Sequence, residues 1–168
     1  VSVQNKLFGL RTLALAICLI GILATPMPVA AQTIREAVWS GKFYPADKSD
    51  LQQMIAALTR QARKTAFTPP PQQELKALIL PHAGYIYSGL TAAHASLLLK
   101  PRQYKKVILM GPDHRVGFRN GAISNVDFYE TPLGKIKIHP DAAGLRLLSN
   151  LFQTSAASDR MEHSLEVL

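Results

Sequence analysis

Residues 75–85 have the sequence Leu-Lys-Ala-Leu-Ile-Leu-Pro-His-Ala-Gly-Tyr, and residues 105–114 repeat the pattern as Lys-Lys-Val-Ile-Leu-Met-Gly-Pro-Asp-His. In both stretches a short apolar run is followed within a few residues by a histidine, His82 in the first and His114 in the second. Apolar runs without polar alternation favour strands that are buried on both faces of a parallel sheet. The two stretches therefore predict a pair of buried strands, over 75–80 and 105–110.

The segment between these two predicted strands has the length and composition of one helix. Residues 88–99 are rich in Ala and Leu, and Ser88 is a suitable N-cap. A strand–helix–strand unit places its two parallel strands with their carboxyl ends at the same edge of the sheet. We therefore predict an α/β fold with a mainly parallel sheet flanked by helices, in which His82 and His114 converge.

The remaining elements are predicted from caps, periodicity and turn residues. Ser49 and Gln52 form a capping box, and apolar residues from Leu51 to Leu58 follow with helical spacing. Strand-like segments at 122–128 and 135–138 flank a turn at 130–134, which favours an antiparallel hairpin. Pro140 and Asp141 predict the start of a helix that continues to Leu151.

Residues 1–31 have the pattern of a secretory signal peptide. A short basic region is followed by the apolar run Leu13–Ala24, and small residues at Val29 and Ala31 suit a cleavage site. We therefore expect a signal peptide at 1–31, one domain at 32–168, a periplasmic or secreted location, and membrane contact only through the signal before its cleavage. The alternative is a membrane anchor, but the apolar run is shorter than the roughly 20 residues of a spanning helix.

The formal net charge is +8, and the basic residues are scattered along the chain. No aromatic residues alternate with them, as a stacking surface for single-stranded nucleic acid would require. We therefore expect no nucleic-acid partner. A mildly basic surface could favour an anionic small molecule or peptide, but the charge alone does not predict one.

Several residues could form a metal-dependent site. Neutral imidazole binds zinc, iron and copper, so His82 and His114 are candidate ligands. His163 and Glu166 would share one face of a helix and could serve as a ligand pair or as a base and its orienting group. Tyr85 could donate a proton. Simpler roles exist for the other candidates: Asp113 could bind metal or only the backbone of its loop, His94 could be a core residue, and His139 a helix cap.

Five motifs in order resemble the Memo family, also called AmmeMemoRadiSam system protein B in bacteria. They span residues 35–168: Arg-Glu-Ala at 35–37 with Gly-Lys-Phe-Tyr-Pro-Ala-Asp at 41–47, Pro-His-Ala-Gly-Tyr-Ile-Tyr-Ser-Gly at 81–89, Gly-Pro-Asp-His at 111–114, Val-Asp-Phe-Tyr-Glu-Thr-Pro-Leu-Gly at 126–134, and Glu-His-Ser-Leu-Glu at 162–166. The resemblance implies a fold similar to class III extradiol dioxygenases, with a pocket for iron or copper at the strand ends.

On this resemblance the metal histidines are His82 and His114, and the His-Ser-x-Glu motif falls on His163 and Glu166. The resemblance also implies a third ligand from a C-terminal part that follows this motif, so that residues 32–168 would be an incomplete domain. The leading hypothesis is a metal-binding protein with a redox or dioxygenase-like site, in which His163, Glu166 and Tyr85 assist the chemistry. The alternatives are a non-catalytic module that binds a peptide or small anion, and a truncated product without function.

Overall fold

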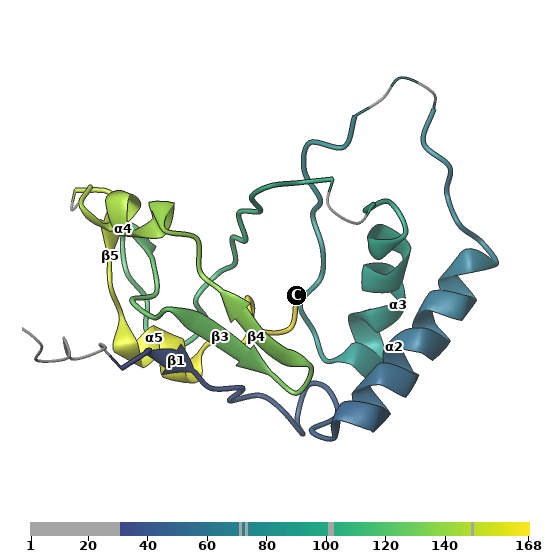
Figure 1. Ribbon diagram of the computed structural model, residues 1–168, viewed down its shortest axis with the longest axis horizontal. Coiled ribbons are helices and arrows are strands. Elements are labelled where there is room, and N and C mark those ends of the chain that lie inside the picture. The colour runs from purple at the N-terminus through teal and green to yellow at the C-terminus, as the bar shows by residue number, and fades with distance from the viewer. Residues whose placement is uncertain (1–30, 71, 73, 101–102, 149) are drawn as a thin grey trace, which may run out of the picture. The chain divides into compact units, whose positions relative to one another are not determined.

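The computed structural model of the protein describes residues 31–70, 72, 74–100, 103–148 and 150–168. The predicted signal peptide lies outside these residues, except for Ala31. Residues 32–168 form one compact unit of helices and strands, which is compatible with the predicted α/β class (Figure 1). The described strands form two small sheets with parallel and antiparallel pairs, where one mainly parallel sheet was predicted. In the part of the chain that is described, no helix is long and apolar enough to cross a membrane.

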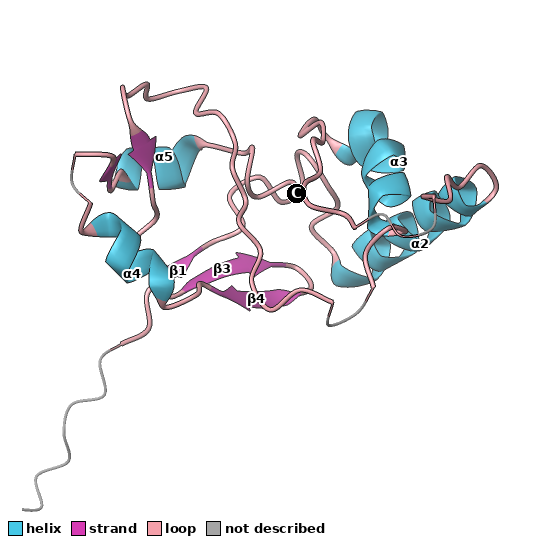
Figure 2. Cartoon of the chain, turned by 90° about the horizontal axis from the view of Figure 1, so that it is seen from above, coloured by secondary structure: helices cyan, strands magenta, loops and turns pink. Residues whose placement is uncertain are grey.

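Two helices, α2 (Lys48–Arg63) and α3 (Tyr85–Ser96), pack side by side (Figures 1 and 2). The N-cap of α2 is Asp47, two residues before the predicted cap, because its carboxylate accepts hydrogen bonds from the backbone N–H groups of Ser49 and Asp50. The helices approach closely at Gly89 of α3, where an added Cβ would lie 2.7 Å from Cδ1 of Leu58. Helix α3 ends near its predicted position but begins earlier, at Tyr85.

The strands form two small sheets. In the first, β1 (Ile34–Arg35) pairs in parallel with β3 (Phe128–Thr131), which pairs antiparallel with β4 (Gly134–Lys137). This β3–β4 hairpin confirms the predicted antiparallel hairpin, but its turn is at 132–133 and its first strand begins at Phe128, where the strand predicted at 122–128 was to end. In the second, β2 (Gly121–Ala122) pairs in parallel with β5 (Phe152–Gln153). Two short helices, α4 (Asp141–Arg146) and α5 (Ala156–Met161), complete the described elements, and α4 stops well before the predicted end at Leu151.

The prediction of strands at 75–80 and 105–110 is wrong, because neither segment has regular secondary structure. Among the described residues, no backbone hydrogen bond joins them to each other or to a sheet. Many of their apolar residues are exposed, up to 100% for Ile79 and 85% for Met110, whereas the leucines at 75, 78 and 80 are half-buried. The apolar composition therefore did not predict burial in these two segments. A buried strand also needs hydrogen-bond partners for its backbone N–H and C=O groups, and composition does not show whether these are present.

These two segments nevertheless run in the same direction. At their beginnings the hydroxyl of Tyr104 donates to the carbonyl of Leu75 at 3.1 Å. After their ends, Nε2 of His82 and Nε2 of His114 lie 3.5 Å apart. The histidines are thus brought together as predicted for parallel strands, although the strand hydrogen bonds are absent among these residues.

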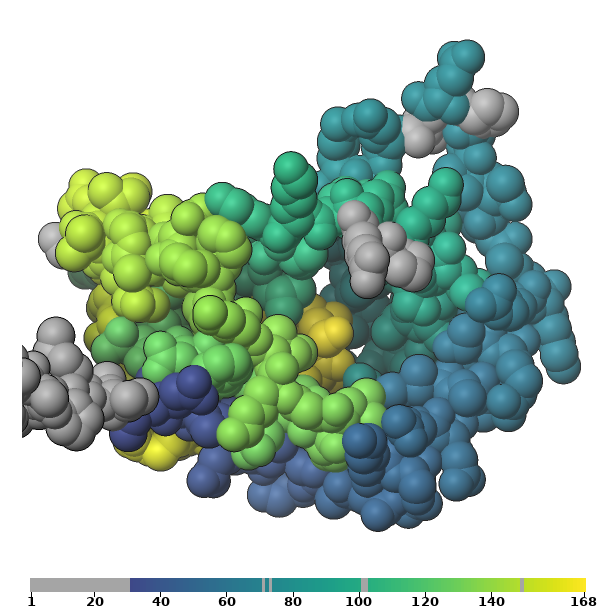
Figure 3. Space-filling model, viewed as in Figure 1, coloured from purple at the N-terminus to yellow at the C-terminus, as the bar shows by residue number. Residues whose placement is uncertain are grey.

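The C-terminal residues of the chain are the best buried part of the unit. Ser164 is fully buried, and Glu162, Glu166 and Val167 are nearly so. In the space-filling view, the yellow C-terminal residues are recessed behind green and teal atoms (Figure 3). Residues 164–166 form a turn, so the helix that would place His163 and Glu166 on one face is not formed.

Candidate metal centre

His82 lies in the short loop that leads into α3, and this loop is held from two sides. The N–H of Tyr85 donates to the carbonyl of Phe43 at 2.8 Å, and the hydroxyl of Ser88 donates to the carbonyl of Ala83 at 2.7 Å. Gly84 permits the close approach, since an added Cβ would lie 3.3 Å from the carbonyl oxygen of Phe43. The His82 ring is therefore carried by a loop that packs on the segment before α2.

His114 lies in a second loop, which Asp113 organises. The Asp113 carboxylate accepts hydrogen bonds from the N–H groups of Arg115 and Val116, at 2.8 and 2.6 Å, and from the hydroxyl of Ser158. The hydrogen bond from Ser158, together with the backbone bonds, lowers the pKa of Asp113 to about 2 although burial opposes the shift. The sequence left two roles open for Asp113, as a metal ligand or as a hydrogen-bond acceptor for the backbone of its loop. The geometry favours the second role.

His163 comes from the C-terminal turn and packs into an aromatic environment. Its ring lies 4.5 Å from the ring of Phe43 and 5.7 Å from that of Trp39, measured between centroids. Burial lowers the pKa of His163; the Glu162 carboxylate opposes this shift, and repulsion from His114, His82 and Arg115 adds to it. The neutral ring that results is the form in which histidine binds metals.

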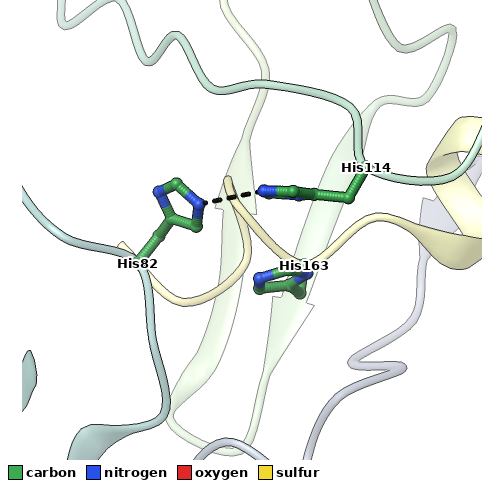
Figure 4. Close-up of side chains that lie close together, drawn as sticks. All are labelled: His82, His114 and His163. Carbon is green, nitrogen blue, oxygen red and sulfur yellow. Dashed lines mark hydrogen bonds between the residues drawn. The ribbon is translucent and has the colours of Figure 1, made fainter. Parts of the chain in front are cut away.

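The three rings converge from three separate segments (Figure 4). His114 and His163 are stacked, with centroids 4.8 Å apart and planes 22° apart, while His82 faces His114 through Nε2. One ring nitrogen from each histidine lies within 4.8 Å of the other two. The sequence predicted the pair His82 and His114 as ligands; the structure adds His163 to the same cluster.

The cluster fits a metal ion by the chemistry of its donors and by the spacing of one pair; all three nitrogens lie within 4.8 Å, so the rings would move closer to share one ion. Imidazole nitrogens bind zinc at about 2.0–2.1 Å, so two of them on one tetrahedral ion lie about 3.4 Å apart. The 3.5 Å separation of the Nε2 atoms of His82 and His114 matches this value. Nδ1 of His163 is buried and makes no hydrogen bond in the described part of the chain, although it lies 3.2 Å from Oε1 of Glu162. It is a buried nitrogen that a ligand could satisfy.

Glu162 is the carboxylate nearest the cluster, and sequence reasoning did not single it out. Its oxygens accept hydrogen bonds from the N–H groups of His114, His163 and Ser164 and contact Nδ1 of His114 at 3.0 Å. Burial raises its pKa, but these hydrogen bonds outweigh burial and lower it to about 2. The signals in the sequence were that Glu162 directly precedes a candidate site histidine and begins the motif at 162–166.

Glu166 lies within the same turn, but its carboxylate is engaged elsewhere. It accepts hydrogen bonds from the guanidinium of Arg35 at 2.5 Å, from the N–H of Trp39 at 2.7 Å and from the hydroxyl of Tyr44 at 2.6 Å. Burial, and then the bond to Glu166, raise the pKa of Tyr44. These contacts tie the C-terminal turn to the first described segment of the chain, and they hold the turn that carries His163.

Tyr85, the third residue predicted to assist chemistry, is the first residue of α3. Its ring lies 5.7 Å from that of Tyr44, and burial raises the pKa of its hydroxyl. His94 and His139 lie outside the three-histidine cluster, on α3 and two residues before α4 respectively. The neighbours of His139 include Asp141, whose N–H donates to its Nδ1 at 3.2 Å.

Comparison with known proteins gives a consistent result. Residues 35–168 match the family described as Memo-like protein. The chain is 34% identical over 134 residues to Protein MEMO1 of Xenopus tropicalis and 33% identical over 134 residues to Protein MEMO1 of Homo sapiens, which is 79% of this chain and 43% of each relative. A MEMO1 family protein of Schizosaccharomyces pombe is 33% identical over 139 residues, 82% of this chain and 43% of the relative. The matches thus cover less than half the length of these relatives.

Proposed function

This chain belongs to the family of Memo-like proteins, and on that premise we propose that it supplies His82, His114 and His163 to a mononuclear site for iron or copper with a redox, dioxygenase-like function. The observation that carries the proposal is the convergence of three ring nitrogens from three separate segments within 4.8 Å. Three imidazole ligands leave coordination positions open for a substrate or oxygen, as catalytic metal sites require.

The donor set favours a transition metal, and the choice of iron or copper among these rests on the resemblance to the Memo family. Imidazole suits zinc, copper, iron and nickel, whereas calcium and magnesium prefer oxygen ligands. The carboxylate closest to the cluster, Glu162, is occupied by backbone N–H groups and by His114. When bound, an iron or copper ion supplies Lewis acidity and one-electron chemistry at this position.

The residues of the chain then have distinct tasks. His82, His114 and His163 hold the ion as neutral rings, and the lowered pKa of His163 favours this form. Glu166 holds the turn that carries His163, through its bonds to Arg35 and Tyr44. Tyr85 is half-buried and is the candidate proton donor for a small-molecule substrate; burial raises the pKa of its hydroxyl, so the hydroxyl carries its proton at neutral pH.

Two further points belong to the same proposal. The fold of the whole domain would be similar to that of class III extradiol dioxygenases, which is the basis for a dioxygenase-like rather than a hydrolytic reaction.

The apolar run and small residues at 1–31 support export to the periplasm or the medium. The matches cover less than half the length of the relatives. We therefore propose this activity for the complete site of a Memo-like protein.

Oxygen consumption tests the proposed reaction. The full chain is loaded with Fe(II) without oxygen and then mixed with air-saturated buffer and a catechol, with the Fe(II)-loaded His139→Ala variant as a control outside the cluster. We expect oxygen uptake that depends on the catechol, that His139→Ala retains, and that His82→Ala abolishes. Stoichiometric Fe(II) binding without catechol-dependent oxygen uptake would contradict the dioxygenase-like function and leave a binding role.

A further inference from the structure

The carboxylate of Glu162 accepts hydrogen bonds from two of the three segments that carry the clustered histidines, those of His114 and His163. Oε2 accepts the backbone N–H of His114 at 2.6 Å, and Oε1 accepts the N–H groups of His163 and Ser164, each at 2.8 Å. The side chain is about one-tenth exposed, so water competes little for these bonds. One buried carboxylate therefore connects the loop of His114 to the turn of His163.

The same carboxylate also contacts the ring of His114. Oε1 lies 3.0 Å from Nδ1 of His114, within hydrogen-bond distance. An ionised carboxylate only accepts hydrogen bonds, so Nδ1 must carry the proton. In a neutral ring the other nitrogen, Nε2, then keeps its lone pair, and this is the atom that lies 3.5 Å from Nε2 of His82.

From this geometry we propose that Glu162 is a positioning residue that fixes His114 in the Nδ1–H tautomer, with Nε2 directed at the metal position. The inference deepens the proposed function and rests on it for its metal-binding part. Carboxylates that accept from the second nitrogen of a metal-binding histidine orient the ring and raise its basicity. Glu162 does not itself belong to the ligand set, because its oxygens are already filled by four donors.

The tautomer is measured directly on the metal-free protein. Long-range proton–nitrogen correlation spectra of the ¹⁵N-labelled full chain at pH 8, where histidines of ordinary pKa are neutral, distinguish protonated from unprotonated ring nitrogens. His114 is assigned from the signal that His114→Ala removes. We expect His114 to be in the Nδ1–H form in the wild type and to lose this preference in Glu162→Gln, with Glu74→Gln as the exposed control. A wild-type His114 protonated at Nε2 would overturn the proposal.

Metal affinity is the second readout, measured by anaerobic calorimetric titration with Fe(II). Loss of such an orienting carboxylate typically weakens metal binding about 10–100-fold, and we expect Glu162→Gln to fall in this range. In the His114→Ala background the same substitution should have little further effect, because its target ring is gone. An equal loss in both backgrounds would mean that Glu162 acts only by holding the loops, and would overturn the proposal.

The two readouts separate this inference from the proposed function. If the wild type binds no Fe(II) but His114 is in the Nδ1–H form only while Glu162 is present, the metal site fails and the positioning role stands. If the wild type binds Fe(II) and Glu162→Gln changes neither the tautomer nor the affinity, the metal site stands and the positioning role fails.

Discussion

Arg35 and Glu166 form a buried ion pair, with Nη1 and Oε2 2.5 Å apart, although 131 positions separate them in the sequence. Both side chains are almost completely excluded from solvent, at 5% and 1% exposure. The second guanidinium nitrogen donates to the carbonyl of Glu162 at 2.7 Å. A single arginine thus fixes both ends of the turn that contains His163.

Removing the positive partner should strongly destabilise the protein. Arg35→Gln leaves the Glu166 carboxylate buried without its cation, and breaking such a pair from one side costs about 3–5 kcal/mol. Urea unfolding followed by circular dichroism measures the free energy of unfolding. Lys76→Gln is the matched control, because it breaks a fully exposed pair with Glu74 and should leave that free energy unchanged. Equal effects of the two substitutions would contradict the structural role of Arg35.

Glu162 should make the stability depend on pH in acid. Its pKa is about 2 in the folded protein and about 4.3 in an unfolded chain, so the folded state favours the ionised form. This contribution, up to about 3 kcal/mol, is fully present above about pH 5 and is lost as the pH falls toward 2. Urea midpoints at a series of pH values from 6 to 3 should therefore converge for wild type and Glu162→Gln. A difference that stays constant over this range would show that ionisation of Glu162 is not involved.

The approach of the His114 loop to the C-terminal turn depends on Gly111. A Cβ at this position would lie 2.5 Å from Oγ and 2.9 Å from Cβ of Ser164, whose hydroxyl donates to the carbonyl of Pro112 at 2.9 Å. Gly111→Ala should therefore separate the two segments, lower the free energy of unfolding by about 1–3 kcal/mol and weaken metal binding.

Gly144 provides the comparison for this substitution. It lies in α4, and an added Cβ would meet no atom within 4 Å. Gly144→Ala should leave metal binding unchanged and raise the free energy of unfolding by up to about 1 kcal/mol, because alanine favours the helix. If Gly111→Ala and Gly144→Ala changed the free energy of unfolding and the metal affinity alike, the close contact at Gly111 would not be needed for stability or for metal binding.

The sequence predicted local elements better than their pairing. The stripe from Leu51 to Leu58 identified α2, since helix periodicity depends only on neighbouring residues. The apolar runs at 75–80 and 105–110 were wrongly predicted as strands, because composition does not show whether a backbone partner is present. The approach of His82 to His114 was nevertheless predicted, because both segments run in the same direction up to their histidines.

The C-terminal part of the candidate site was harder to predict. The spacing of His163 and Glu166 suggested one helical face, but the chain forms a turn in which Glu166 binds Arg35 and His163 approaches His114. The function of Glu162 depends on backbone N–H groups that come from two distant loops. Long-range contacts of this kind leave no periodic signal in one sequence.

The most direct test of the metal centre is an anaerobic Fe(II) titration of the wild type and of five single histidine-to-alanine variants. The account predicts one ion per chain. Removal of a ligand should weaken binding by more than the about 10–100-fold that is typical of residues that only orient a ligand. This loss is expected for the cluster residues His82, His114 and His163, whereas the controls His94 and His139 should retain binding. Absence of binding in the wild type, or equal binding in all five variants, would contradict the account.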